Sequence, residues 1–179
     1  MNTIPARSEL SAGTVVRVVA AAAILVGGLV HLQLYFDGYR DFPDANLGRS
    51  FLANGIASAV IAAALVFRRD VVVRLAGAGL VVGTLVAFWI SRTDRGIFGF
   101  TEVGFEPSPQ AALALFSEIA ALVLIAATFL PALGAGDDLS PTAALPAAAV
   151  IAGVTIVGAA LWARTPEAPT EGTPETTVA

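Results

Sequence analysis

The chain has 179 residues, a formal net charge of −4, and a composition that is 56% hydrophobic but only 13% charged. Soluble domains need about 25% charged residues to keep their surface hydrated, so much of this surface must face lipid, and the bilayer is the first partner that the sequence predicts. The sequence has no cysteine and a single histidine, which excludes disulfides, thiolate metal sites, iron–sulfur clusters and a bis-histidine haem within one chain. With no basic block either, we expect no cofactor and no nucleic acid.

Five apolar runs are long enough to cross a bilayer, since about 20 helical residues at 1.5 Å each span about 30 Å of hydrocarbon. They lie at about 15–36, 51–67, 71–90, 111–130 and 143–162. The first run is longer than a signal-peptide core, so we expect it to remain in the membrane. The sequence thus predicts an all-α, polytopic transmembrane helix bundle over residues 1–164. The segment 165–179, rich in Pro, Thr and Glu, is predicted to be a disordered tail.

Local signals mark several helix ends. Asp70 can N-cap the third helix and make a tight hairpin with the second. Ser108 and Pro109 predict a capping hydroxyl followed by a proline at the first position of the fourth helix. Pro131 and Gly134 are expected to help end that helix.

The arginines predict the orientation. Arg68, Arg69 and Arg74 form the densest basic segment, and Arg7 and Arg17 lie on the same side. The other side carries an equal number of arginines together with several carboxylates, which count for little in the positive-inside rule. We therefore expect a multi-pass protein of the plasma membrane with a cytoplasmic N-terminus and an extracytoplasmic C-terminus.

Small residues recur at spacings that favour close approach of membrane helices. The three patterns are Ala23-x-x-x-Gly27, Gly55-x-x-x-Ala59-x-x-x-Ala63 and Gly79-x-x-x-Gly83. We expect helix contacts at these positions.

Among the polar residues of the predicted spans, His31, Asn54 and Glu118 lie well inside, with Gln33, Ser50, Arg92 and Gln110 nearer the ends. Ionisable groups are costly in hydrocarbon and usually face the bundle interior. At 1.5 Å per residue, the three lie roughly 7 to 13 Å from the same end of the bundle. Each shares its helix face with small or hydroxyl residues, because positions three and four apart lie together. We therefore predict a polar cluster near the extracytoplasmic leaflet.

Two loops cover this end, at about 37–49 and 91–108, and the second is long for a helix connection. It supplies Arg92, Glu102 and Glu106, so the candidate ligand- or ion-binding residues are His31, Asn54, Arg92, Glu102, Glu106 and Glu118. A structural interpretation stands beside this one: His31 could pair with Glu118, or Arg92 with Glu118 or with the loop carboxylates. The chain has donors for a metal but no spaced ligand motif, so we assign neither a metal site nor a catalytic residue.

The chain resembles a family in its polar region. The residues concerned run from Gly28-Leu29-Val30-His31-Leu32 through Pro43, Leu47-Gly48 and Ser50-Phe51-Leu52 to Ser91-Arg92-Thr93, Gly96, Gly99-Phe100, Glu106-Pro107 and Glu118. Over roughly 25–120 this pattern is similar to that of small multi-pass integral membrane proteins of high-GC, actinobacterial-type bacteria with no assigned activity. The resemblance implies topology and marks His31, Arg92 and Glu118. Some members carry extra first-loop histidines, and their absence here disfavours metal binding.

Three functional hypotheses follow. The first is an accessory or interaction subunit, with a membrane-protein partner or a homo-oligomer, because the chain is small and lacks motifs such as G-x-x-x-x-G-K-S/T or H-E-x-x-H. The second is binding or transport of a small solute, ion or proton at the polar cluster. The third is a membrane enzyme with His31 as general base beside Glu118.

Overall fold

The computed structural model describes residues 11–134 and 136–138. In these ranges the chain forms four α-helices, one short 3-10 helix and no β-strand: α1 (Ala12–Phe36), η1 (Tyr39–Asp41), α2 (Ala45–Phe67), α3 (Val71–Ser91) and α4 (Gln110–Ala127). The predicted all-α fold is confirmed for these residues. The predicted fifth span at 143–162 and the predicted tail at 165–179 lie outside them.

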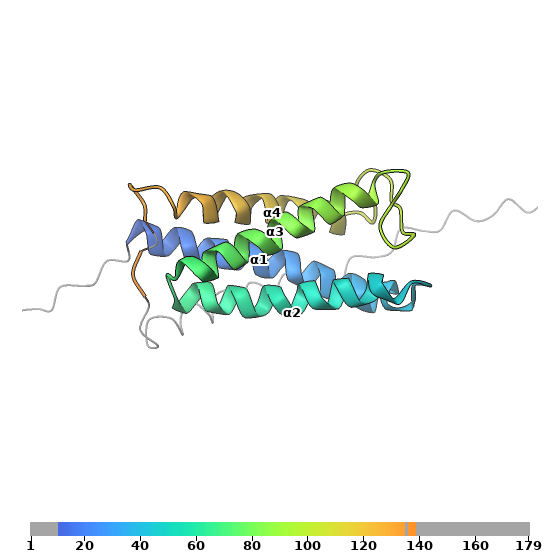
Figure 1. The fold of residues 1–179 in the computed structure, drawn as a ribbon, viewed down its shortest axis with the longest axis horizontal. Helices are drawn as coiled ribbons and strands as arrows, with labels where there is room; N and C mark the ends of the chain where they lie inside the picture. Colours follow the sequence, from blue (N-terminus) through green and yellow to red (C-terminus); the bar gives the residue numbers. More distant parts are fainter. Residues whose placement is uncertain (1–10, 135, 139–179) are drawn as a thin grey trace, which may run out of the picture.

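The four helices run along the long axis of the molecule (Figure 1). α1 packs against α2 and α4, and α3 contacts α2 and α4. α2 and α3 meet at the turn 68–70 and then diverge, so that α3 ends beside the start of α4 (Figure 1).

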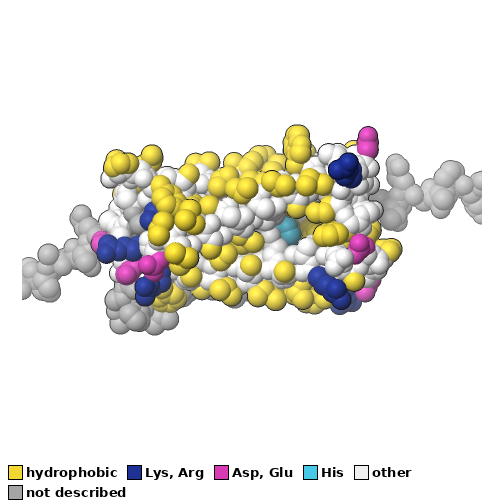
Figure 2. Space-filling view, viewed as in Figure 1, with side chains coloured by type: hydrophobic (Ala, Val, Ile, Leu, Met, Phe, Trp, Pro, Cys, Tyr) yellow, Lys and Arg dark blue, Asp and Glu magenta, His cyan; other side chains and the backbone are white. Residues whose placement is uncertain are grey.

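All four helices are long and apolar enough to cross a membrane. On the face in Figure 2, charged side chains gather at the two ends, and the middle is hydrophobic or uncharged. Large apolar side chains such as Val60, Val86 and Phe116 point outward and are more than half exposed. An outer surface of this kind suits lipid and is compatible with an integral membrane protein.

α2 starts earlier than predicted, at Ala45 rather than near residue 51. The carboxylate of Asp44 accepts a hydrogen bond from the backbone N–H of Asn46 at 2.9 Å, which starts the helix before the apolar run begins. Asp70 does occupy the N-cap position of α3, as predicted, but its side chain makes no capping bond. It pairs with Arg68 at 2.9 Å instead.

α4 differs from the prediction at both ends. Pro109 occupies the N-cap position, so it is not the first helical residue, and Ser108 lies too early to cap the helix. The helix ends at Ala127 rather than near residue 130. Pro131 cannot donate the hydrogen bond that would continue the helix, and it disfavours helical backbone at the residue before it. The chain turns there, and Gly134 donates to the Leu130 carbonyl at 2.8 Å.

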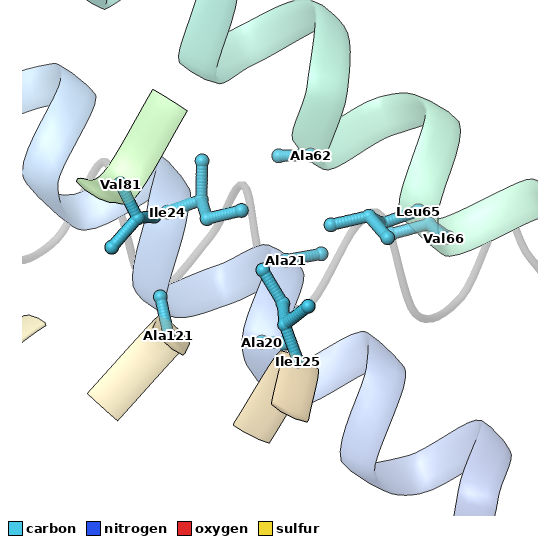
Figure 3. Packing of buried hydrophobic residues seen from close by; sticks show 9 residues of the cluster. All are labelled: Ala20, Ala21, Ile24, Ala62, Leu65, Val66, Val81, Ala121 and Ile125. Carbon is cyan, nitrogen blue, oxygen red and sulfur yellow. The ribbon is translucent and has the colours of Figure 1, made fainter. Parts of the chain in front are cut away.

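The main core lies where all four helices meet (Figure 3). Four of its nine buried residues are alanines, which let the helix backbones approach closely. The members are Ala20, Ala21 and Ile24 of α1, Ala62, Leu65 and Val66 of α2, Val81 of α3, and Ala121 and Ile125 of α4. These residues lie toward the end of the bundle opposite the loop 92–109.

The small-residue patterns are only partly found at helix contacts. A methyl group on Gly27 would come within 2.6 Å of Glu118, so α1 meets α4 there, and one on Gly55 would overlap Leu32, so α2 meets α1. Ala59 and Ala63, by contrast, are exposed. The contact predicted at Gly79 and Gly83 is wrong for the described residues, because a Cβ at either position would meet nothing within 4 Å.

Arginines fasten the other end of the bundle. Arg17 is fully buried in α1 and donates to the Asp137 carbonyl at 2.6 Å. Arg74 of α3 donates to the Thr128 carbonyl at 3.0 Å and lies over the ring of Phe129, 4.2 Å from its centre. These arginines hold the chain that follows α4 against α1 and α3, in addition to any effect they have on the orientation of the protein in the membrane.

Candidate functional site

A pocket of about 120 Å³ lies between the helices at the end where they diverge. All four helices and the loop 92–109 line it. Five of the six candidate residues are in its wall: His31, Asn54, Arg92, Glu102 and Glu118. Glu106 does not line the pocket, and its side chain is exposed. The structure thus gathers the predicted polar cluster around one cavity.

Arg92 follows directly after α3 and uses all of its donors within the protein. A guanidinium has five N–H groups, and five hydrogen bonds of 2.7 to 3.2 Å leave this one. They go to the carbonyls of Phe88, Gly104 and Glu106, to the Ser91 hydroxyl and to the Glu102 carboxylate. Its carbon Cζ also lies 3.4 Å from the centre of the Phe88 ring. Arg92 therefore holds the loop in place and has no N–H left for a ligand.

Glu102 is equally well satisfied. One oxygen, Oε2, accepts from Arg92 at 3.2 Å, and the other, Oε1, accepts from the Tyr39 hydroxyl at 2.5 Å. Burial raises the pKa of Glu102 and lowers that of Arg92, and in each case the neighbouring opposite charge partly offsets the effect. Burial, with the hydrogen bond to Glu102, also raises the pKa of Tyr39. We call Tyr39, Glu102 and Arg92 the loop clasp.

Aromatic rings support the loop clasp. The Tyr39 ring lies 4.8 Å from that of Phe51 and 5.3 Å from that of Phe100, and Phe100 meets Phe42 edge to face at 5.6 Å. Such pairs add about 0.5–1.5 kcal/mol each beyond their buried area. The loop clasp and these rings hold the loop 92–109 in place, so that it covers the pocket at this end of the bundle.

Asn54 links the two diverging helices. Its amide donates to the Thr84 hydroxyl of α3 at 2.6 Å and accepts from the Ser58 hydroxyl at 3.3 Å. Thr84 donates in turn to the Leu80 carbonyl at 3.0 Å. Asn54 thus limits how far α2 and α3 separate.

His31 has one nitrogen engaged and one open. Its Nδ1 lies 2.8 Å from the Gly27 carbonyl. Because a carbonyl can only accept, Nδ1 must carry the proton, and in the neutral ring Nε2 is left with a lone pair. Nε2 has no hydrogen-bond partner among the described residues. The ring is held by Phe51, whose centre lies 5.2 Å away.

Glu118 is 2% exposed, and its Oε2 has no hydrogen-bond partner in the described part of the chain. It lies on the α4 face formed by Ala111, Ala114 and Ala121, which are all buried. The adjacent Ser117 donates to the Ala114 carbonyl at 2.9 Å and so does not serve the carboxylate. No hydrogen bond joins Glu118 to His31 or to Arg92 in the described residues, so these two pairs are not formed. The other pair considered from the sequence, Arg92 with a loop carboxylate, is formed with Glu102.

Sequence reasoning missed Tyr39 and Thr84. The Tyr39–Glu102 bond joins residues 63 apart in the chain, and no local pattern indicates it. Thr84 could have been noticed as a lone hydroxyl within an apolar run. Within the described ranges, no three His, Cys, Asp or Glu side chains are placed to share a metal ion.

Fold and site together define a small helical bundle of the membrane-protein type, with a polar pocket near one end that the loop 92–109 covers. No protein-family model matches the chain, and neither a curated protein nor a solved structure matches it at a significant level.

Proposed function

We propose that this chain is a small-ligand-binding protein of the bacterial plasma membrane, with His31 and Glu118 as the groups that contact the ligand. Its place among the small multi-pass proteins of high-GC bacteria and its cytoplasmic N-terminus are part of the proposal. In that orientation Arg68 and Arg69 lie on the cytoplasmic side, and the pocket lies near the extracytoplasmic leaflet.

One observation carries the proposal: among the described residues, the ionisable side chains around the pocket have their hydrogen-bond partners, except for Nε2 of His31 and Oε2 of Glu118. Arg92, Glu102 and Asn54 have their partners, so they position the loop and the helices. A buried polar group without a partner costs about 1–3 kcal/mol, and more if it is charged. A ligand that supplies the missing hydrogen bonds would remove this cost.

The single histidine makes a direct test feasible. Diethyl pyrocarbonate is a small uncharged reagent that adds to an unprotonated imidazole nitrogen. We expect the folded protein, in vesicles, to take up one carbethoxy group at His31, identified by peptide mapping against His31→Gln. Filling the pocket by Ala114→Leu should slow this reaction severalfold, whereas Ser117→Ala should not. A folded protein whose His31 reacts only after unfolding would overturn the proposal.

A role as an accessory subunit is the second candidate, and the exposed face of α3 favours it. α3 is the least buried of the four described helices, and no described residue comes within 4 Å of a Cβ built on Gly79 or Gly83. Such a surface suits close packing of another membrane helix, from a partner protein or a second copy. Purification in mild detergent should then yield a complex that Gly83→Leu disrupts. A protein that elutes reproducibly as a lone monomer would rule this role out.

A further inference from the structure

The pocket has unused hydrogen-bond acceptors, whereas the hydroxyl and guanidinium donors of its wall are bonded within the protein. The lone pair of His31 Nε2 and the Oε2 of Glu118 are open. The hydroxyls in the wall already donate: Tyr39 to Glu102, Ser50 to Leu47, Thr84 to Leu80, and Ser91 to Phe88. Asn54 gives one of its two amide N–H groups to Thr84. A ligand that satisfies both open acceptors brings N–H or O–H donors, and an amine beside a carboxyl group can form a charge-assisted hydrogen bond.

A bare metal ion does not fit this arrangement. Two protein ligands are fewer than the three or four that zinc takes from proteins, and the described residues hold no larger cluster. The pocket wall also contains the rings of Tyr39, Phe51 and Phe100. Aromatic faces attract organic cations by about 0.5–2 kcal/mol. An organic ammonium group satisfies both the acceptors and the rings.

The route to the pocket lies on the side of the bundle. The loop clasp and the Phe100–Phe42 contact cover the outer end. The chain's single histidine, by contrast, is visible in the side view of Figure 2 between α2 and α3, and its exposure is intermediate. In this view the histidine lies among hydrophobic and uncharged surface atoms, between the charged groups at the two ends, where the acyl chains of a bilayer would be. A ligand that uses it must partition into the membrane.

From these observations, and resting on the proposed ligand-binding function, we propose that the pocket binds the ammonium head of a membrane-soluble amine. The N–H groups would donate to His31 Nε2 and Glu118, and the alkyl chain would leave between α2 and α3. The geometry also accounts for Asn54, whose bond to Thr84 holds these helices at a fixed separation.

The test uses the full chain in phosphatidylcholine nanodiscs, with its histidine labelled by ¹⁵N in the ring. Because there is one histidine, the two ring signals belong to His31. Dodecylamine is titrated in, with dodecanol, dodecanoic acid, dodecyltrimethylammonium and butylamine as comparison probes. We expect dodecylamine to shift the Nε2 signal and raise the apparent Tm. Glu118→Gln should weaken its binding by about 10- to 100-fold, the loss expected for a charge-assisted hydrogen bond.

Ser117→Ala is the matched control and should bind dodecylamine as the unaltered protein does, because its hydroxyl is bonded within α4. His31→Gln is the second variant, should Glu118→Gln fail to fold. Nanodiscs that contain phosphatidylethanolamine distinguish an aminolipid from a single-chain amine, since an aminolipid ligand would shift Nε2 without any added probe.

Several outcomes would overturn the inference. Equal binding of dodecanol, or dodecylamine binding unchanged in Glu118→Gln, would show that the charge is not recognised. Equal binding of butylamine would overturn the membrane route. If diethyl pyrocarbonate reaches His31 but no amine binds, the ligand class is wrong while the proposed function stands. If the reagent does not reach His31 in the folded protein, the proposed function itself fails.

Discussion

The carboxylate of Glu118 lies against the Cα of Gly27, where a methyl group would come within 2.6 Å of Oε1. The same Gly27 accepts the His31 Nδ1 hydrogen bond through its carbonyl. One glycine thus makes room for the carboxylate and fixes the tautomer of the histidine, so it positions both open groups of the pocket.

Gly27→Ala should therefore lower the stability of the protein. The added methyl group would force the buried carboxylate to move, and overpacking of this kind costs about 1–3 kcal/mol. The loss should shrink in a Glu118→Ala background, where the obstructing atoms are gone, as a double-mutant cycle would show. Gly79→Ala, on the open face of α3, is the control and should cost nothing. An equal loss in both backgrounds would contradict the contact.

Arg92→Gln should release the loop 92–109. The change removes several hydrogen bonds and leaves the Glu102 carboxylate half-buried without its cation, a loss of about 3 kcal/mol. We expect faster hydrogen exchange over residues 93–106 and a lower apparent Tm. Arg95→Gln is the control, because Arg95 is exposed and makes no hydrogen bond in the described residues. Unchanged exchange in Arg92→Gln would mean that the clasp does not hold the loop.

The loop clasp should make the protein sensitive to alkali. The folded state raises the pKa of Tyr39, so above about pH 10, the ordinary tyrosine value, the unfolded chain loses a proton that the folded chain keeps. This contribution is fully present below about pH 10 and is lost as the pH rises above it. The apparent Tm should therefore fall as the pH rises above about 10.

Tyr39→Phe should have a lower Tm at neutral pH, because Glu102 loses a donor, but should lack much of the alkaline fall. Tyr35→Phe is the matched control, since the Tyr35 hydroxyl makes no hydrogen bond in the part of the chain that the structure describes. It should keep the full alkaline fall. Parallel curves for Tyr39→Phe and the unaltered protein would refute the coupling.

Asn54→Ala and Thr84→Val should each loosen the contact between α2 and α3. Hydrogen bonds between membrane helices are worth about 0.6 kcal/mol on average and up to about 1.7, and the short 2.6 Å bond places this pair toward the upper value. A double-mutant cycle on unfolding in detergent measures the coupling. Ser50→Ala is the control, because Ser50 bonds within its own helix. A coupling energy near zero would show that the bond does not link the helices.

The sequence by itself determined the helical class and the positions of the four described spans. It also placed His31, Asn54 and Glu118 at one depth and on inward faces. Those properties depend on the length of each apolar run and on the helical repeat, and both follow from the order of residues along the chain. The predicted starts of α1 and α2 were too late, because a capping side chain such as Asp44 can begin a helix before the apolar run.

Only the tertiary structure decided which polar residues are open to a ligand. From the sequence, Arg92 and Glu102 are candidates equal to His31 and Glu118, since each is a polar group near the same end. Whether a group is satisfied depends on the path of the loop 92–109 and on a Tyr39–Glu102 bond across 63 residues. Such contacts follow from packing in three dimensions, and no periodic pattern encodes them.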